Sequence, residues 1–174
     1  MAACRAILTV TENENGSVMK NGRLVIEYIT HCLSSGNRDD SGDRFLRDTA
    51  GSIIWNQSWW YSALSKAIEQ AGVRNIKAGH FNFDPIIAAK TDSCRRKYGG
   101  NNYRIHESIL PGTRVEFNFI VPDHVTAPMV RRVMEHLGKH IGLTPFGYNL
   151  GYGKFNVIDV DIASSMDVPT AIPQ

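Results

Sequence analysis

Four glycines and two tyrosines mark the segment that runs from residue 142 to residue 154, "GLTPFGYNLGYGK". Glycine has no Cβ, so such a segment adopts positive φ angles and lets a ligand approach the main chain, where N–H groups face phosphate oxygens. Tyrosine rings are platforms on which unpaired bases stack. The residues predicted here to contact nucleic acid are Gly142, Gly147, Tyr148, Gly151, Tyr152, Gly153 and Lys154.

The same glycine pattern has a purely structural interpretation. The glycines then make a tight turn, and the aromatic side chains fill the edge of the core. The segment does not fit the phosphate-binding pattern GxxxxGK[ST], and it follows a predicted helix instead of a strand. These two features exclude a Walker loop and a dinucleotide-binding fingerprint.

A second candidate binding region lies between residues 90 and 104. The formal net charge of the whole chain is only +2, but residues 74–104 contain seven Lys or Arg against two Asp. A locally basic, aromatic-bearing stretch suits contact with phosphates. We expect residues 90–104 to form an exposed basic loop, with binding residues Arg95, Arg96, Lys97, Tyr103 and Arg104.

The six histidines are the candidate acid–base groups at neutral pH. His136 and His140 are four residues apart on a predicted helix, a spacing that lets two imidazoles share a metal ion. Because the sequence indicates no third ligand, we expect no metal site and no cofactor. His106 is adjacent to Glu107 on a predicted strand, so their side chains point to opposite faces and do not act as a pair.

Composition indicates one domain over residues 1–174. The three cysteines form no C-x-x-C pair, which favours a reducing cytoplasm over a disulfide framework. No apolar stretch is long enough to span a membrane, so we expect no membrane association. Residues 34–48 are predicted to be a polar loop, solvated or ordered on binding, and residues 164–174 a flexible tail.

The predicted elements alternate between strands and helices. Apolar residues at helical spacing from Trp60 to Ala71 predict a first helix, with Ser58 as its N-cap and Gly72 after its end. "TRVEFNFIV" alternates as a half-buried strand, Thr126 and Pro128 open a second helix that Gly142 ends, and "KFNVIDVDIA" is a last strand. The order predicts an α+β, ferredoxin-like (RRM-like) fold with helices on one face of an antiparallel sheet and loop insertions.

Three stretches carry a resemblance to a known family: "ESILPGTRVEFNF", "LGKHIGLTPFGYNLGYGKFNV" and "RDTAGSIIWNQSWWYSALSKAI". Residues 44–162 resemble the RAMP superfamily, the ferredoxin-fold RNA-binding proteins of CRISPR effector complexes. The resemblance implies that Gly142, Gly151, Gly153 and Lys154 lie in a glycine-rich loop that contacts the RNA backbone before the last strand. Some RAMP relatives cleave RNA with a histidine and no metal, a role that His106, His80 or His31 would fill here.

Three functions follow as hypotheses. The first is a non-catalytic protein that holds single-stranded RNA through the glycine-rich and basic loops, as a CRISPR RAMP-like subunit or a stand-alone phage or mobile-element relative. The second is a metal-independent endoribonuclease on the same fold, with His106 as its catalytic residue. The third is a structural or interaction protein of a phage, which the modest net charge favours. Expected partners are single-stranded RNA and either further copies of the chain or effector-complex subunits.

Overall fold

A computed structural model of the chain describes residues 10–12, 18–35, 37–39, 42–98 and 100–163. Its main sheet contains β2 (Val18–Tyr28), β8 (Asn82–Phe83), β12 (Arg114–Pro122) and β13 (Phe155–Ile162). The strands lie in the order β13-β2-β12-β8, and every neighbouring pair is antiparallel. A short β1 (Val10–Glu12) pairs with the start of β2. The two strands predicted to share one antiparallel sheet, β12 and β13, both pair with β2, which confirms that prediction.

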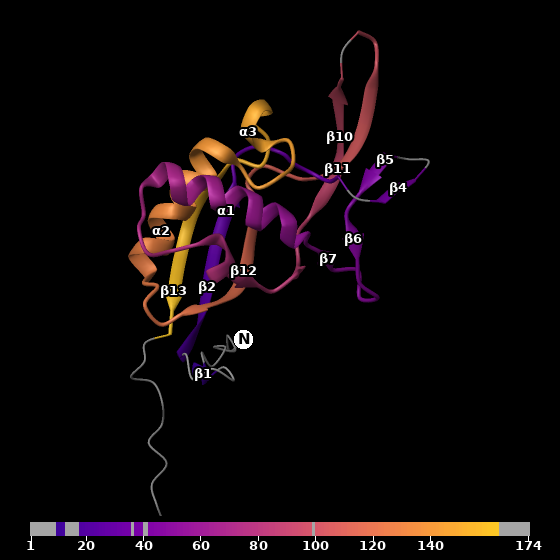
Figure 1. The fold of residues 1–174 in the computed structure, drawn as a ribbon. Coiled ribbons are helices and arrows are strands. Elements are labelled where there is room, and N and C mark those ends of the chain that lie inside the picture. Colours follow the sequence, from indigo (N-terminus) through magenta and orange to yellow (C-terminus); the bar gives the residue numbers. More distant parts are fainter. Residues whose placement is uncertain (1–9, 13–17, 36, 40–41, 99, 164–174) are drawn as a thin grey trace, which may run out of the picture.

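Two helices connect these strands. α1 (Gln57–Ala71) lies in the chain between β2 and β8, and α2 (Ala127–His136) joins β12 to β13 through a π-helical turn, η2 (Leu137–Ile141). Both helices lie on the same face of the main sheet (Figure 1). This β-α-β-β-α-β order, with its 4-1-3-2 arrangement of strands, is the ferredoxin-like fold, as the sequence predicted.

The ends of the helices follow local sequence signals. α1 begins after Asn56, whose side-chain oxygen accepts the N–H of Ser58 at 2.9 Å, and ends at Gly72 with a φ of 63°. The prediction of Ser58 as the N-cap is therefore wrong by two residues, because the amide of Asn56 captures the free N–H first. Thr126 precedes α2 with Pro128 in its first turn, as expected.

The core lies between the helices and the main sheet. Alternate residues of β12 from Val115 to Val121 are all at most 2% exposed, as the alternation of "TRVEFNFIV" predicted. Trp60 stacks on Phe83 with ring centroids 3.9 Å apart. Trp55 is equally buried and packs edge-on against Phe117. Aromatic burial of this kind is a large contribution to stability.

A second sheet is inserted beside this core. It contains β3 (Cys32–Leu33), β4 (Asn37–Asp39), β5 (Gly42–Arg44), β10 (Thr91–Lys97) and β11 (Tyr103–Ile109), with β10 and β11 forming an antiparallel hairpin. The hairpin projects well beyond the main sheet (Figure 1). A third, small sheet consists of β6 (Leu46–Arg47), β7 (Ile53–Ile54) and β9 (Ile86–Ile87). A 3-10 turn, η1 (Ala78–His80), and a short helix, α3 (Gly147–Leu150), complete the described elements.

Two sequence predictions about these inserted segments are wrong. Residues 90–104 are not a loop, because β10 and the start of β11 pair in register from Thr91↔Ile109 to Lys97↔Tyr103. Residues 34–48 are not a solvated loop either, since they contain β4, β5 and β6, and Ser34 and Phe45 are buried. Contacts with β11, which is distant in sequence, order this polar segment. The predicted tail, residues 164–174, lies outside the described residues.

The outer face of the main sheet carries ion pairs. Arg23 of β2 lies 2.8 Å from Glu116 on one neighbouring strand and 3.0 Å from Asp159 on the other. Between Val157 and Asp159 the register of β13 against β2 shifts, which is a β-bulge at Ile158.

Among the described residues, no helix has the length and apolar character needed to cross a membrane.

Candidate nucleic-acid interface

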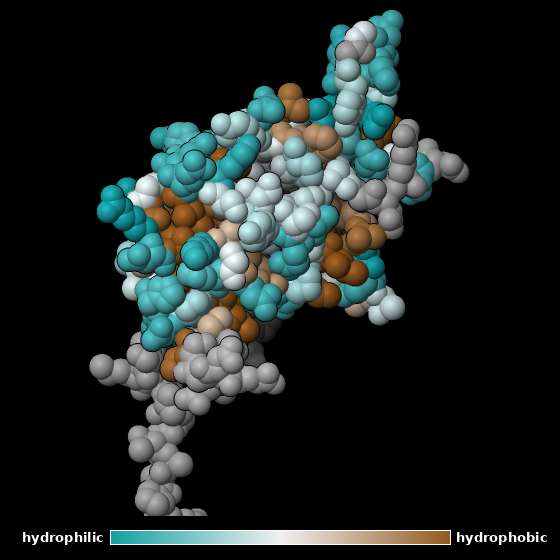
Figure 2. Space-filling model, viewed as in Figure 1, coloured by the Kyte–Doolittle hydropathy of each residue, from teal (hydrophilic) through white to brown (hydrophobic). Residues whose placement is uncertain are grey.

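The two faces of the projecting hairpin carry different sets of cations. In the β10–β11 register Arg96 is opposite Arg104, whereas Arg95 is opposite Ile105 and Lys97 is opposite Tyr103. Because side chains alternate along a strand, Arg96 and Arg104 share one face and Arg95 and Lys97 the other. We call the first the inner face of the hairpin and the second its outer face. Most of the projecting part of the hairpin has hydrophilic side chains (Figure 2).

The inner face meets the glycine-rich segment. The guanidinium of Arg96 lies 4.2 Å from the ring centroids of both Tyr98 and Phe146, and 5.8 Å from that of Tyr152. Its Nη1 also donates to the Tyr98 hydroxyl at 3.0 Å, and the guanidinium of Arg104 lies 4.9 Å from the Tyr98 ring. The structure thus brings together two regions that the sequence indicated separately.

On the outer face, the cations surround one tyrosine. The Arg95 guanidinium lies 4.1 Å from the centre of the Tyr103 ring, and the Lys97 ammonium lies 6.0 Å from it. Tyr103 and Ile105 are both more than 40% exposed. This face offers positive charge and exposed apolar surface side by side, a combination suited to a phosphate backbone and its bases.

A buried carboxylate anchors the base of the hairpin. Glu107 is 6% exposed and accepts hydrogen bonds from the Thr91 hydroxyl at 2.7 Å, from the Phe45 N–H at 2.9 Å and from Arg47. Burial alone raises the pKa of this carboxyl, but the three hydrogen bonds and the charge of Arg47 outweigh it, so the net pKa is lowered. Glu107 is therefore ionised and ties β11 to β10 and to the polar segment before α1.

His106 lies directly under Tyr98 and is fully buried. Its Nδ1 is 2.9 Å from the Ser34 carbonyl oxygen and 3.2 Å from an Asp43 carboxylate oxygen, and its Nε2 is 2.8 Å from the Tyr98 hydroxyl. Because both atoms near Nδ1 are acceptors, Nδ1 carries a proton. With no exposed face, the imidazole here serves to hold Tyr98. The acid–base role expected for His106 stays a prediction.

Three of the predicted binding glycines have a structural reason to be glycine. Gly142 has a φ of 83°, and a Cβ there would collide with the Tyr152 carbonyl oxygen. A Cβ on Gly147 would meet the Ile141 carbonyl oxygen, and one on Gly153 would lie 2.6 Å from Thr144 Cγ2. The segment therefore folds back on itself too closely for any side chain at these three positions.

Several N–H groups of the same segment donate within the chain. Gly142 donates to Leu137, Gly147 to Thr144, Gly151 to Gly147 and Gly153 to His31, with N···O distances of 2.7–3.0 Å. The Lys154 N–H donates to the Thr30 hydroxyl at 2.8 Å. These donors are occupied within the chain, and contact of this segment with phosphate stays a prediction. Gly151, at a φ of 76° with open space around it, is the exception to the close packing.

The side chains of the glycine-rich segment remain candidates for contact. Tyr148 is 51% exposed, and the Lys66 ammonium of α1 lies 3.9 Å from its ring centroid. Tyr152 is half-buried on the side of the segment that faces Arg96. Lys154 is also half-buried, and burial lowers the pKa of its ammonium. The segment therefore contributes aromatic surface more than charge.

Sequence reasoning missed two members of this site, Tyr98 and Phe146. Both are aromatic residues inside the two candidate stretches, but only the fold shows that Arg96 lies against both rings. The signal that could have identified Tyr98 is its position next to "RRK" and before "GG", which is typical of a hairpin tip.

The other histidines lie away from this site or in structural contacts. His31 Nδ1 is 2.9 Å from the Ser108 hydroxyl, and His80 packs against His124 with centroids 5.2 Å apart. The rings of His136 and His140 are 4.6 Å apart, and His136 Nε2 is 3.1 Å from Gln70 Oε1. In the described ranges, no group of three or more His, Cys, Asp or Glu is placed to hold a metal ion.

Comparisons with known proteins give a likeness of fold. No protein-family model matches the sequence, and no curated protein matches it. A chain in a cryo-EM structure of the type III-B Cmr-beta bound to cognate target RNA superposes with a TM-score of 0.60 and 15% identity. The match covers 83% of this chain and 60% of that one, so this chain spans about three-fifths of its neighbour. The likeness agrees, at the level of fold, with the resemblance to RAMP proteins.

A second structural match is weaker. It is to Csc2 of Thermofilum pendens, with a TM-score of 0.34, 11% identity, and coverage of 83% of this chain and 67% of that one.

Proposed function

We propose that this protein binds single-stranded RNA, with the β10–β11 hairpin supplying cations and the glycine-rich segment supplying the adjoining aromatic surface. The observation that carries the proposal is the position of Arg96 between Tyr98 of the hairpin and Phe146 of the segment. One guanidinium thereby joins the two regions into a continuous basic and aromatic surface. Such surfaces follow single strands by phosphate contact and base stacking.

The hairpin cations are held in a way that keeps their charge available. Arg95, Arg96 and Arg104 each lie within 5 Å of a tyrosine ring centroid. A ring fixes the position of a guanidinium without neutralising it, whereas a carboxylate would cancel its field. Phosphates then bind to charges that are already ordered, which lowers the entropic cost of binding.

The fold likeness supports a particular setting for this activity. The Cmr-beta structure is described as bound to cognate target RNA. We infer that this chain acts as a CRISPR RAMP-like subunit, or as a phage or mobile-element relative of one, in a complex with further subunits or with its own copies. A row of exposed apolar side chains across β6, β7 and β9 favours such contacts: Leu46, Ile54 and Ile86 are opposite one another and 37–45% exposed (Figure 2).

Salt dependence of RNA binding tests the proposal. Binding of a fluorescent 20-nucleotide oligouridylate is measured by anisotropy over a series of salt concentrations. The slope of log K against log salt is negative, and each lost phosphate contact makes it shallower by about 0.7 for a single strand. Replacing Arg95, Arg96 and Lys97 together by Ala should make the slope shallower by roughly 2 and weaken binding at low salt.

A charge-matched control variant carries Ala at Arg131, Arg132 and Lys139, on α2 and η2. It should retain the wild-type slope. Wild-type protein that does not bind the oligonucleotide, or equal slopes for the two triple variants, would overturn the proposal. Gel analysis of the same RNA after incubation with EDTA distinguishes holding from metal-independent cleavage, which the burial of His106 makes the weaker hypothesis.

A further inference from the structure

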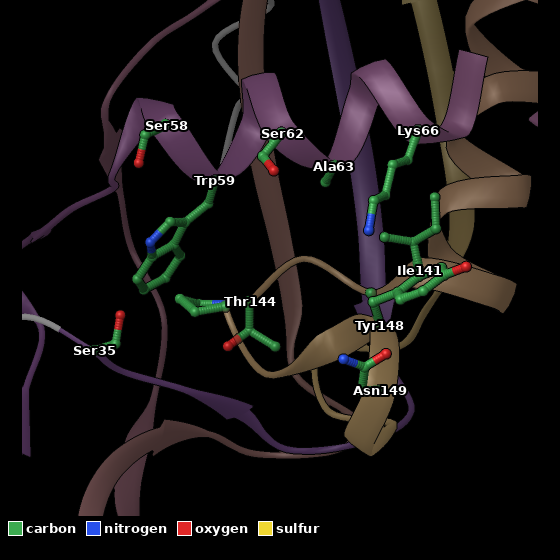
Figure 3. Close-up of a pocket in the computed structure, with 12 residues that line it drawn as sticks. Ser35, Ser58, Trp59, Ser62, Ala63, Lys66, Ile141, Thr144, Tyr148 and Asn149 are labelled. Carbon is green, nitrogen blue, oxygen red and sulfur yellow. The ribbon is translucent and has the colours of Figure 1, made fainter. Parts of the chain in front are cut away.

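A groove lies between α1 and the glycine-rich segment. It has a volume of about 530 Å³, within the usual size range of small-molecule sites. Figure 3 shows that side chains from α1 and from the glycine-rich segment face each other across it. No pattern in the sequence indicates this groove, because its two walls are about 80 residues apart in the chain.

The α1 wall of the groove combines hydroxyl groups, an ammonium and an aromatic ring. Ser58, Ser62 and Lys66 recur every fourth residue, so they lie along one side of the helix (Figure 3). Trp59 lies beside them, half-buried, and is held edge-on by Trp55 with ring centroids 5.2 Å apart. The indole is thus a fixed aromatic surface at one end of the groove.

The opposite wall ends in a second aromatic ring. Tyr148 and Asn149 of α3 lie at the other end of the groove from Trp59 (Figure 3). Lys66 reaches across the groove to the Tyr148 ring, 3.9 Å from its centroid. Buried Ile141 and Thr144 line the groove between the two ends. Asn149, whose side chain is exposed, is both a donor and an acceptor.

We propose that this groove receives one unstacked nucleotide of the bound RNA. This inference rests on the proposed function and extends it from a charged surface to a base-binding site. A nucleotide needs an aromatic surface for its base, an amide for the base edge and a cation with hydroxyl donors for its phosphate. The groove contains all of these in one small volume: Trp59 and Tyr148, Asn149, and Lys66 with Ser58 and Ser62.

The position of the groove explains how one strand would engage both sites. Within the same segment, Pro145 and Tyr148 line the groove, while Phe146 and Tyr152 face Arg96 of the hairpin. The two surfaces are therefore separated only by the thickness of the segment. A strand that follows the hairpin cations can place a neighbouring base over the segment and into the groove.

Tryptophan fluorescence reports occupancy of the groove directly. Trp55 and Trp60 are each 2% exposed, so a base that quenches emission by stacking acts on Trp59. Titration with adenosine monophosphate and with the 20-nucleotide oligouridylate should both quench emission, and Trp59→Phe should abolish the change. Tyr148→Ala should weaken oligonucleotide binding about tenfold, within the range for loss of one base–aromatic stack. Tyr61→Ala is the matched control, because Tyr61 is 63% exposed on α1 and does not line the groove.

The two binding readouts separate this inference from the proposed function. In one outcome, oligonucleotide binding depends on the hairpin cations but is unchanged in Tyr148→Ala, and Trp59 emission is not quenched. This outcome would overturn the groove assignment and leave the proposed function intact. If mononucleotide quenching is lost in Trp59→Phe but the oligonucleotide does not bind, the groove is a nucleotide site and the proposed function, with RNA as the source of the nucleotide, is overturned. Equal losses in Tyr61→Ala and Tyr148→Ala would also overturn the groove assignment.

Discussion

The hairpin and the glycine-rich segment lie in contact but are built in opposite ways. The hairpin presents side chains, with cations on both of its faces and rings that hold them. The glycine-rich segment instead uses its backbone internally, since the N–H groups of Gly142, Gly147 and Gly153 all donate within the chain. One region supplies charge on a projecting support, and the other supplies a closely packed platform beside it. The glycines that first suggested a phosphate site also allow the close packing of that platform.

Substitution of Gly142 should produce the largest effect on stability. Gly142→Val adds a side chain at a φ of 83°, where its Cβ would collide with the Tyr152 carbonyl oxygen. We expect a loss of about 3 kcal/mol in the free energy of unfolding, from strain and overpacking together. Gly151→Ala is the comparison, because it has only a positive φ and open space, and should cost about 1 kcal/mol. Chemical denaturation measures both, and equal losses would contradict the close packing at Gly142.

Substitution of Glu107, which anchors the base of the hairpin, should have the next largest effect on stability. Glu107→Gln removes the charge that strengthens three buried hydrogen bonds, so we expect a loss of about 2 kcal/mol at pH 7. Because the pKa of Glu107 is lowered in the folded protein, its stabilising contribution is present at neutral pH. That contribution is lost as the pH falls below the ordinary carboxyl pKa of about 4.5 toward the lowered value. Thermal melts between pH 7 and pH 3 should show a smaller pH dependence for Glu107→Gln than for the wild type.

The two faces of the hairpin should contribute equally to salt dependence but unequally to stability. Arg95→Ala with Lys97→Ala removes two outer cations, and Arg96→Ala with Arg104→Ala removes two inner ones. Each pair should reduce the salt slope of RNA binding by about 1.4. Only the inner pair should also lower the melting temperature, because Arg96 packs on Phe146 and Tyr98. A lower melting temperature in the outer pair alone would contradict the packing role of Arg96.

Lys154→Ala should have the smallest effect. Its ammonium is half-buried, whereas Arg95, Lys97 and Arg104 of the hairpin are exposed, so it is less accessible to phosphate. We expect less than about 1 kcal/mol of lost RNA affinity, measured by anisotropy beside Arg96→Ala. A loss larger than that of Arg96→Ala would show that the platform also supplies charge.

The sequence predicted the central part of the fold well. The strict alternation in β12 and the helical spacing in α1 come from burial on one face, which is a local pattern that any reader of the sequence can detect. The same patterns predicted the shared sheet of β12 and β13. What they did not give was the register of β13 across β2, because it depends on pairing between distant segments.

The hairpin and the polar segment before α1 could not be predicted for a related reason. β10 has no regular apolar alternation, because both of its faces are largely solvated. Its cationic side chains instead pack on aromatic rings of the paired strand, as Arg95 does on Tyr103. Phe45 is ordered by the contact of its N–H with Glu107, 62 residues away. The groove beside α1 is also a product of distant segments. Stabilisation by non-local polar contacts leaves no periodic signal in the sequence.

The bulge in β13 affects strand pairing at one edge of the main sheet. β13 is eight residues long, and within the described residues it pairs only with β2. The shift at Ile158 interrupts the regular backbone spacing of β13, and Asp161 near its end is exposed. Bulges and charges of this kind prevent strand addition and the aggregation that follows from it. Addition of a further strand along β13 is thereby disfavoured.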